Sequence, residues 1–458
     1  MSGTSDEVNE GFHQNSILAR IVSYVDTARQ EPVGDLPRQA ALRCVLDLLG
    51  AAASGINQPG VLAARKTALV TMAAGDVPIW FSGTTSSVVG AAWANSAAAA
   101  ALDLDDGHRL ARGHPGAAVI PTALAIASET DASLEDTLRA IIVGYEVGIT
   151  IGAARTTYGN TGTWSSYAVV ATAAVLRGTA PEILTHALAI AGESSPNQLF
   201  ASAPAPRNPA PEGSDVKEGI PWSVVTGLVA LSLAEAGHTG PRNILDSTRH
   251  YRFSEDLRLG VNPHICNTYF KLYACCRHIH APLDAMLQVV GRYSIDPHSI
   301  DAIEVESTGG ALRISNRDNP TNLVDVQYSI PYCLALATLQ GPQALLPPTP
   351  AVLGQNAVVD LARKVTLSVN ADFDARFPAE TLARVTVTVK GRHFVSDVTA
   401  PKGEASGPLS SAELEGKFRA ATRFSLNPAR QDEIIASINK AFCVDTSKSL
   451  PPLHSVLR

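Results

Sequence analysis

Residues 134–154 read LEDTLRAIIVGYEVGITIGAA, a stretch in which apolar side chains recur at helical spacing with small residues between them. Residues 38–55 (RQAALRCVLDLLGAAASG) and 222–237 (WSVVTGLVALSLAEAG) have the same character and end at a glycine. Aromatic residues make up only 5% of the chain, so the core must consist mainly of aliphatic side chains. The first half of the chain is therefore predicted to form an all-helical bundle.

The periodicity changes in the second half. Residues 300–308 (IDAIEVEST), 364–370 (KVTLSVN) and 382–391 (LARVTVTVKG) alternate β-branched with polar residues, which predicts strands, and residues 391–398 predict a hairpin return strand. Residues 325–341 still have a helical pattern, and the amphipathic tail is expected to pack back on the first domain. The predicted fold is mainly α: a large discontinuous all-helical domain (1–268 and 402–458) and a smaller α+β domain (269–401).

Composition limits the possible partners. The chain has 458 residues, 45% hydrophobic and 17% charged, which is typical of a soluble globular protein with two or three domains. The formal net charge is −7 and the basic residues are scattered, so nucleic acid is not an expected partner. The N-terminal MSGTSDEVNEG lacks the regions of a signal peptide, and the apolar windows are too short to span a bilayer. We expect a cytoplasmic protein without a membrane partner.

Cofactor and metal motifs are not found in the sequence. The six cysteines form no CxxC pair, and we interpret them as reduced thiols. His108 and His114 are not at i, i+4 spacing, so no metal site is expected. GxGxxG, P-loop and nucleophile-elbow motifs do not occur either. The prediction is that side chains alone, without a cofactor, carry out any chemistry.

Residues 101–119, ALDLDDGHRLARGHPGAAV, concentrate ionisable groups after an alanine run. From composition alone, this stretch could equally be a solvated helix end with exposed charges. The Pro-Gly pair at 115–116, however, predicts a turn between two helices, a place where side chains converge on a cleft. This stretch is therefore the first candidate site, with Asp105 and Asp106 interpreted as solvated or structural.

Six blocks in this order resemble the MmgE/PrpD family, which includes methylcitrate dehydratases and cis-aconitate decarboxylases. They are ALDLDDGH…GHPGAAVIPTALAIA, IVGYEVG, NTGTW, AEAGHTGP, FKLYACCRHIHAPLDA and DVQYSIPYCLALAT. The resemblance covers most of the chain. It implies a helical domain made from both chain ends, a smaller α+β domain, an active site between them and a homodimer.

The resemblance also implies site residues. It places Asp103 and His114 in the acidic/histidine block, Tyr145 in the GYEV block, and Tyr332 at a position in SIPY that could face the pocket. In the block K-x-Y-x-x-C-R-x-x-H, it places Lys271, Arg277 and His280.

Two departures from the family pattern bear on the reaction. Gly159 replaces the histidine before TGT, and VKEGIPW keeps Lys217 but has a glycine where another histidine would be. A dehydratase must protonate a leaving hydroxyl as well as remove a carbon-bound proton, so these losses argue against dehydration. They leave proton abstraction possible. Within the family, the chain most resembles the members that epimerise iminodisuccinate without a cofactor.

An epimerase of a small amino polycarboxylate requires two bases on opposite faces of the α-carbon and cations for the carboxylates. Lys271 is the first candidate base if its pKa is lowered, and Tyr145 is the second base or a relay, with His114 or His108 as replacements. Asp103 is expected to orient a histidine or lysine. The candidate substrate-binding residues are Arg277 as a bidentate clamp, Lys217, His108, His280 and Tyr332.

Each candidate also has a structural interpretation: a surface lysine, a core tyrosine, a structural histidine or an unpaired charge. Three other functions remain open. They are a dehydratase or decarboxylase of a tricarboxylate such as 2-methylcitrate or cis-aconitate, a thiol-pair racemase using Cys266, Cys275 or Cys276, and a catalytically silent binding protein.

Overall fold

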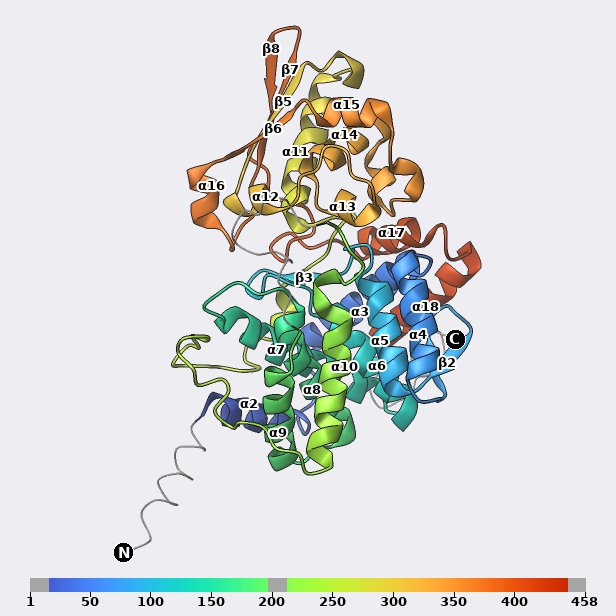
Figure 1. The fold of residues 1–458 in the computed structure, drawn as a ribbon, viewed down its shortest axis with the longest axis vertical. Helices are drawn as coiled ribbons and strands as arrows, with labels where there is room; N and C mark the ends of the chain where they lie inside the picture. Colours follow the sequence, from blue (N-terminus) through green and yellow to red (C-terminus); the bar gives the residue numbers. More distant parts are fainter. Residues whose placement is uncertain (1–15, 197–211, 444–458) are drawn as a thin grey trace, which may run out of the picture.

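The computed structural model, which describes residues 16–196 and 212–443, has a larger and a smaller part (Figure 1). Each part has its own hydrophobic core, and a small third cluster contains Ala51, Leu102, Leu104, Ala274 and Ala421. The larger core takes its side chains from positions 18–270 and again from 409–441. The smaller core takes its buried side chains from positions 273–387. The fold is mainly α with a smaller α+β part, as the sequence predicts.

Helices from both ends of the chain build the larger core. Helix α17, from the C-terminal part of the chain, packs on α3, where Lys417 forms a buried ion pair with Asp47. The helices are α2 (Ile17–Ala28), α3 (Asp35–Gly55), α4 (Pro59–Thr71), α5 (Val88–Ala100), α6 (Gly116–Thr130), α7 (Leu134–Ala154), α8 (Gly162–Arg177), α9 (Pro181–Glu193), α10 (Ile220–Glu235), α17 (Ser411–Thr422) and α18 (Pro428–Cys443). A short hairpin, β1 (Val77–Ile79) and β2 (Thr84–Ser86), packs beside α5.

Helix α7 is the stretch of sequence from which the helical prediction began. Ser133 caps its N-terminus by accepting a hydrogen bond from the Asp136 N–H. Among the described residues, α7 alone is long and apolar enough as a single helix to cross a membrane, yet 89% of that apolar window is buried inside the protein. Burial on nearly all sides explains why polar residues are so few along it.

The smaller domain is a four-stranded sheet with helices packed against it (Figure 1). The strand order is β6 (Val365–Val369), β5 (Ala302–Ser307), β7 (Arg384–Val389) and β8 (Arg392–Val395), with β5 and β6 parallel and the other pairs antiparallel. Alternate residues of β5 and β7 are buried, as expected for a sheet with one covered face. The predicted hairpin of β7 and β8 is confirmed. The domain's helices are α11 (Arg277–Tyr293), α12 (Gly309–Arg313), α13 (Leu323–Gln327), α14 (Ile330–Gln340), α15 (Asn356–Ala362) and α16 (Ala371–Arg376).

One predicted helix is divided in the structure. The pattern at 325–341 predicts continuous helix, but α13 ends at Gln327 and α14 begins at Ile330. Pro331 lies in the first turn of α14, where it restricts the preceding residue, and the Ser329 side chain caps α14 by accepting from the Tyr332 N–H. Local proline and capping chemistry therefore overrides the apolar periodicity.

The chain crosses between the domains next to the ionisable stretch. A two-stranded ladder pairs β3 (Gly107–His108) with β4 (Thr268–Tyr269). This ladder lies between the two domains, and the first crossing follows β4 directly (Figure 1). The segment at 103–114 therefore lies beside the segment that contains Lys271.

Candidate active site

The ionisable stretch forms a buried loop. Helix α5 ends at Ala100 and α6 begins at Gly116, and three carboxylates lie between them: Asp103, Asp105 and Asp106. All three are at most 4% exposed, so the interpretation of Asp105 and Asp106 as solvated is wrong, while a structural role remains. Asp103 has a φ of 52°, a left-handed conformation that a non-glycine residue adopts only when its surroundings hold it there.

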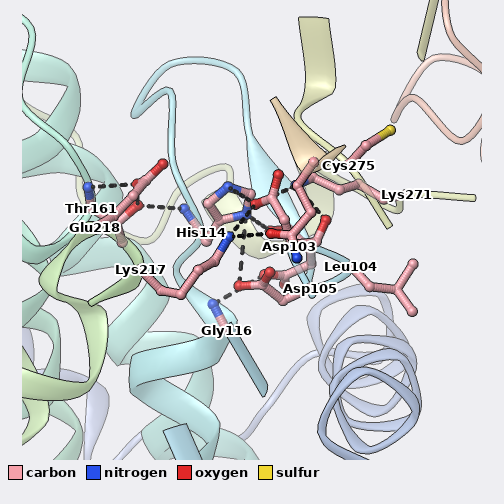
Figure 2. Close-up of polar contacts among 12 residues, drawn as sticks. Asp103, Leu104, Asp105, His114, Gly116, Thr161, Lys217, Glu218, Lys271 and Cys275 are labelled. Atoms are coloured by element: carbon pink, nitrogen blue, oxygen red, sulfur yellow. Dashed lines mark hydrogen bonds and ion pairs between the residues drawn. The ribbon is translucent and has the colours of Figure 1, made fainter. Parts of the chain in front are cut away.

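Three cationic or basic side chains converge on one oxygen of Asp103 (Figure 2). Lys271 Nζ lies 3.0 Å from Asp103 Oδ1 and also donates a 2.9 Å hydrogen bond to the Asp103 carbonyl. His114 Nε2 lies 3.5 Å from the same Oδ1, and Lys217 Nζ lies 4.0 Å from it. Residues 103, 114, 217 and 271 thus form one cluster, which we call the Asp103 cluster.

The protonation states of Lys271 and Asp103 are coupled. Burial disfavours both charged forms, but the two opposite charges stabilise each other. The net result is that the pKa of Asp103 is lowered and the pKa of Lys271 is raised. The expectation that Lys271 has a lowered pKa is wrong, because a carboxylate, and not another cation, is its nearest charge. Lys271 is thus a buried ammonium.

His114 has one ring nitrogen committed and one available. Its Nδ1 lies 2.6 Å from the carbonyl oxygen of Asp106, which can only accept, so Nδ1 carries the proton. In the neutral ring, Nε2 is then the basic nitrogen, and it faces Asp103. The His114 backbone N–H donates to the hydroxyl oxygen of Thr161 at 3.1 Å, which holds the residue from the other side.

Asp106 and Tyr145 form a second layer behind His114. The Tyr145 hydroxyl donates to Asp106 Oδ2 at 2.5 Å, and the Gly116 N–H donates to Asp106 Oδ1 at 3.1 Å. Burial raises the pKa of Asp106 to about 7, and burial together with the Asp106 charge raises the pKa of Tyr145 well above its usual value. The expectation that Tyr145 is a base or relay is not supported by this geometry, because its proton is held in the second layer.

Lys217 is held by side chains of the small domain. Its Nζ donates to Gln327 Oε1 at 2.7 Å and lies 5.2 Å from the centre of the Tyr328 ring. Gln327 in turn donates to the Ala101 carbonyl of the ionisable loop at 3.1 Å. The Lys217 ammonium thus lies where elements of both domains meet.

Arg277 has internal partners. Its guanidinium forms an ion pair with Glu404, donates to the Lys402 carbonyl at 3.1 Å and lies 4.4 Å from the Tyr269 ring centre. The expected bidentate clamp on a substrate is therefore already engaged by a protein carboxylate. Glu404 also pairs with Arg109 of the ionisable loop, so it joins this loop to the start of α11.

The other predicted residues lie in separate surroundings. His108 is buried, its ring meets the edge of the His264 ring at 5.4 Å, and burial lowers its pKa to about 3. His280 lies beside Arg277 and the Cys275 carbonyl, and burial lowers its pKa well below its usual value. Tyr332 lies in the smaller core, where its hydroxyl donates to the Val352 carbonyl. The hydrogen bonds and ring contacts named here do not reach the Asp103 cluster, although the Lys271 charge also contributes to the lowered pKa of His280.

The cysteines of this region are poor thiolates. Burial raises the pKa of Cys276 to about 12 and also raises the pKa of the fully buried Cys275 well above its usual value. Cys266 is exposed, and its pKa is also raised, chiefly by desolvation. Thiols held in their protonated form do not suit the thiol-pair alternative.

Three side chains of this site carry atoms that ligate metals in other proteins. Asp103, Asp105 and His114 each offer a ligand atom, and these atoms lie within 4.8 Å of one another. However, the ammonium groups of Lys271 and Lys217 lie 3.0 Å and 4.0 Å from Asp103 Oδ1, beside this donor set. A further cation there would be repelled by both lysines, so this donor set does not fit a metal ion.

The position of the missing histidine before TGT has another occupant. A Cβ atom at Gly159 would lie 2.6 Å from the guanidinium of Arg155, so this guanidinium fills the space of a side chain at 159. Arg155 also donates to the Thr163 hydroxyl. The sequence departure therefore replaces an acid/base side chain with a group that remains cationic.

Sequence reasoning missed three contributors: Asp106, Gln327 and Glu218. Each contacts a cluster member or its direct neighbour through a hydrogen bond. Asp106 lies in the same loop as Asp103 and His114, so its position in the sequence could have marked it as a site residue. Gln327 lies 110 positions from Lys217, and nothing in the local pattern marks it.

Comparison with known proteins identifies the family. The chain matches the MmgE/PrpD N-terminal domain over residues 19–253 and the MmgE/PrpD C-terminal domain over residues 273–440. The chain belongs to the MmgE/PrpD family. It is 27% identical over 393 residues to a cis-aconitate decarboxylase of Aspergillus terreus, covering 76% of this chain and 77% of that protein. A second cis-aconitate decarboxylase, from Aspergillus terreus strain NIH 2624 / FGSC A1156, is 26% identical over 392 residues with the same coverage.

Both MmgE/PrpD domain matches contribute residues to the Asp103 cluster or to its direct contacts. Asp103, His114 and Lys217 come from the N-terminal match, whereas Gln327, which holds Lys217, comes from the C-terminal match. Lys271 lies between the two matches, in the first crossing. In this MmgE/PrpD chain, the cluster therefore depends on how the two domains are joined.

Proposed function

We propose that this protein is a cofactor-independent epimerase that inverts an α-carbon of an iminodisuccinate-type amino polycarboxylate. The observation that carries the proposal is the pair that shares Asp103 Oδ1: His114 Nε2 at 3.5 Å and Lys271 Nζ at 3.0 Å. A two-base epimerase must begin with one group unprotonated and the other protonated. The proposal assigns the unprotonated role to His114 Nε2 and the protonated role to Lys271, whose pKa the Asp103 charge raises despite burial.

In the proposed reaction, His114 Nε2 takes the α-proton, and the electrons of the C–H bond move into the adjacent carboxylate. The Lys271 ammonium then delivers a proton to the opposite face of the carbon, which restores the carboxylate. Lys217 and Lys271 stabilise the enolate-like charge between these steps. His114 is left protonated and Lys271 neutral, and solvent exchange or Asp103, which lies between them, returns the proton.

The two missing histidines support this reaction over dehydration. Loss of water from a citrate-type substrate needs an acid for the hydroxyl in addition to the group that removes the proton. At position 159 the available space contains the Arg155 guanidinium, which does not release its proton near neutrality. Proton abstraction and return need only the histidine and the lysine of the cluster.

Decarboxylation of a tricarboxylate is the second candidate, and the two curated relatives favour it because both are cis-aconitate decarboxylases. Such a reaction breaks a carbon–carbon bond, releases carbon dioxide and returns a proton to the carbon. The Lys271 ammonium could supply that proton. Both candidates therefore use the Asp103 cluster, and they differ in the bond that breaks.

Proton NMR in heavy water distinguishes them. One stereoisomer of iminodisuccinate is incubated with the protein without added metal or cofactor, and cis-aconitate is incubated in parallel with detection of carbon dioxide. The proposal predicts loss of the α-proton signal with inversion and no carbon dioxide. Persistent α-protons together with carbon dioxide release would replace it with the second candidate.

Two further expectations stay predictions. The homodimer implied by the family predicts twice the mass of 48.0 kDa in light scattering after size-exclusion chromatography. The cytoplasm remains the predicted location.

A further inference from the structure

Lys217 lies in a turn whose backbone is held in an unfavourable conformation. Lys217, Glu218 and Gly219 have φ values of 44°, 58° and 71°, so three consecutive residues are left-handed and two of them carry side chains. L-residues avoid this region because Cβ approaches the following carbonyl. Such a run persists only where the surroundings hold it.

Glu218 provides contacts that hold this turn. Its Oε2 accepts hydrogen bonds from the Thr161 N–H at 3.2 Å and from the Thr161 hydroxyl at 2.9 Å (Figure 2). Thr161 is the residue before the first turn of α8, where free N–H groups and the helix dipole favour a negative charge. The carboxylate of Glu218 therefore fastens the turn to the start of α8.

Close packing at Gly162 adds a second restraint. A Cβ atom at Gly162 would lie 2.4 Å from the carbonyl oxygen of Glu218 and 2.9 Å from the carbonyl carbon of Gly219. The turn thus rests directly on the helix backbone, at a distance that only glycine permits.

The same threonine also contacts His114. The Thr161 hydroxyl donates to Glu218 and accepts from the His114 backbone N–H at 3.1 Å. The Glu218 carboxylate is thus connected to His114 through the Thr161 hydroxyl. Glu218 is also the next residue in the chain after Lys217. The two cluster members are 103 positions apart in the sequence.

We propose that Glu218 is a positioning residue that sets His114 and Lys217 together against Asp103. Its carboxylate holds the left-handed turn that presents the Lys217 ammonium, and its hydrogen bond to Thr161 fixes the backbone of His114. The activity test of this inference rests on the proposed function. The positions of the two side chains do not, because they can be measured without substrate.

Glu218→Gln keeps the shape of the side chain but removes its charge. The matched control is Glu413→Gln, because Glu413 caps the N-terminus of α17 through the Ser410 N–H and hydroxyl, remote in sequence from the turn. Two substrate-free measurements are made on each variant. They are the rate at which trinitrobenzenesulfonate modifies Lys217, located by peptide mass spectrometry, and the ring ¹⁵N shifts of His114, assigned with His114→Gln.

The proposal predicts that trinitrobenzenesulfonate modifies Lys217 at least threefold faster in Glu218→Gln than in the parent protein. It also predicts shifted His114 ring resonances in this variant, while Glu413→Gln leaves both measurements unchanged. If the parent epimerises iminodisuccinate, Glu218→Gln also lowers kcat more than it changes KM. Equal behaviour of the two variants in both substrate-free measurements would overturn the positioning role, whether or not the parent is an epimerase.

Thr161→Val keeps the test usable if Glu218→Gln does not fold. This variant removes the hydroxyl that joins Glu218 to His114 but keeps the Thr161 N–H. It is expected to shift the His114 resonances and to change Lys217 modification less than Glu218→Gln would. Unchanged His114 resonances in a folded Thr161→Val protein would also overturn the proposal.

Discussion

Lys271 Nζ and Asp103 Oδ1 are 3.0 Å apart, and the lysine side chain has no exposed surface. Two charges taken out of water are stable only while each retains the other, because desolvation costs several kcal/mol per ion. This pair joins the first crossing between the domains to the ionisable loop. It therefore contributes to the joining of the domains and to the proposed chemistry at once.

Lys271→Met should greatly slow inversion of the α-carbon and destabilise the fold. The variant keeps the apolar length of the side chain but leaves the Asp103 carboxylate buried without its nearest cation. We expect activity to fall by about 10²–10⁴-fold and the free energy of unfolding to fall by about 3–5 kcal/mol. Proton NMR in heavy water and urea unfolding measure the two effects, and the exposed Lys440→Met is the control. Full activity in Lys271→Met would contradict the assigned role.

Asp106→Asn should change how stability depends on pH. Burial raises the pKa of Asp106 to about 7, whereas an unfolded aspartate titrates near 3.9. The folded protein thus holds a proton that the unfolded chain releases, so this group stabilises the fold at low pH and the stabilisation is lost as pH rises to about 7.

The variant lacks this titration. Its free energy of unfolding relative to the parent should therefore rise by on the order of 2–4 kcal/mol between about pH 4 and pH 7. Urea unfolding at several pH values measures the difference, with exposed Asp296→Asn as the control. Parallel pH profiles for parent and Asp106→Asn would show that Asp106 ionises normally in the fold.

Gly116→Ala should disturb the layer behind His114. A Cβ atom at 116 would lie 2.6 Å from the Tyr145 hydroxyl and 2.7 Å from Asp106 Oδ1, and both groups are fully buried. Overpacking of this kind costs about 1–3 kcal/mol. Gly416→Ala in α17 is the matched control, because a Cβ there meets nothing within 4 Å and should stabilise the helix by about 0.5–1 kcal/mol. Thermal unfolding of both variants should give shifts of opposite sign.

Glu404→Gln should weaken the connection between the domains. Glu404 pairs with Arg109 and Arg277, which would then be left as two neighbouring guanidiniums without a carboxylate. We expect a loss of about 3 kcal/mol in the free energy of unfolding. The exposed pair of Arg292 and Asp397 supplies the control, Asp397→Asn, which should leave the urea midpoint unchanged. A Glu404→Gln protein as stable as the control would contradict this role.

Periodicity and local motifs account for much of the fold. The apolar pattern of α7 and its neighbours, the alternating strands β5 and β7 and the amphipathic tail are local properties, because side-chain spacing along a helix or strand determines which face can be buried. The block motifs likewise indicated the family and drew attention to Asp103, His114 and Lys271. The predicted helix at 325–341 is divided in the structure, but the proline and the capping serine that divide it are also visible in the sequence.

The charge states of the site depended on tertiary contacts. Lys271 is a cation because Asp103 lies beside it, although 168 positions separate them, and Arg277 is occupied because Glu404 returns from the far side of the small domain. Position 159 is filled by Arg155 rather than left open. The sequence determined the elements and the family, since these follow from local spacing and order. Only the tertiary structure decided which groups carry protons, because a pKa depends on burial and on charges brought together through space.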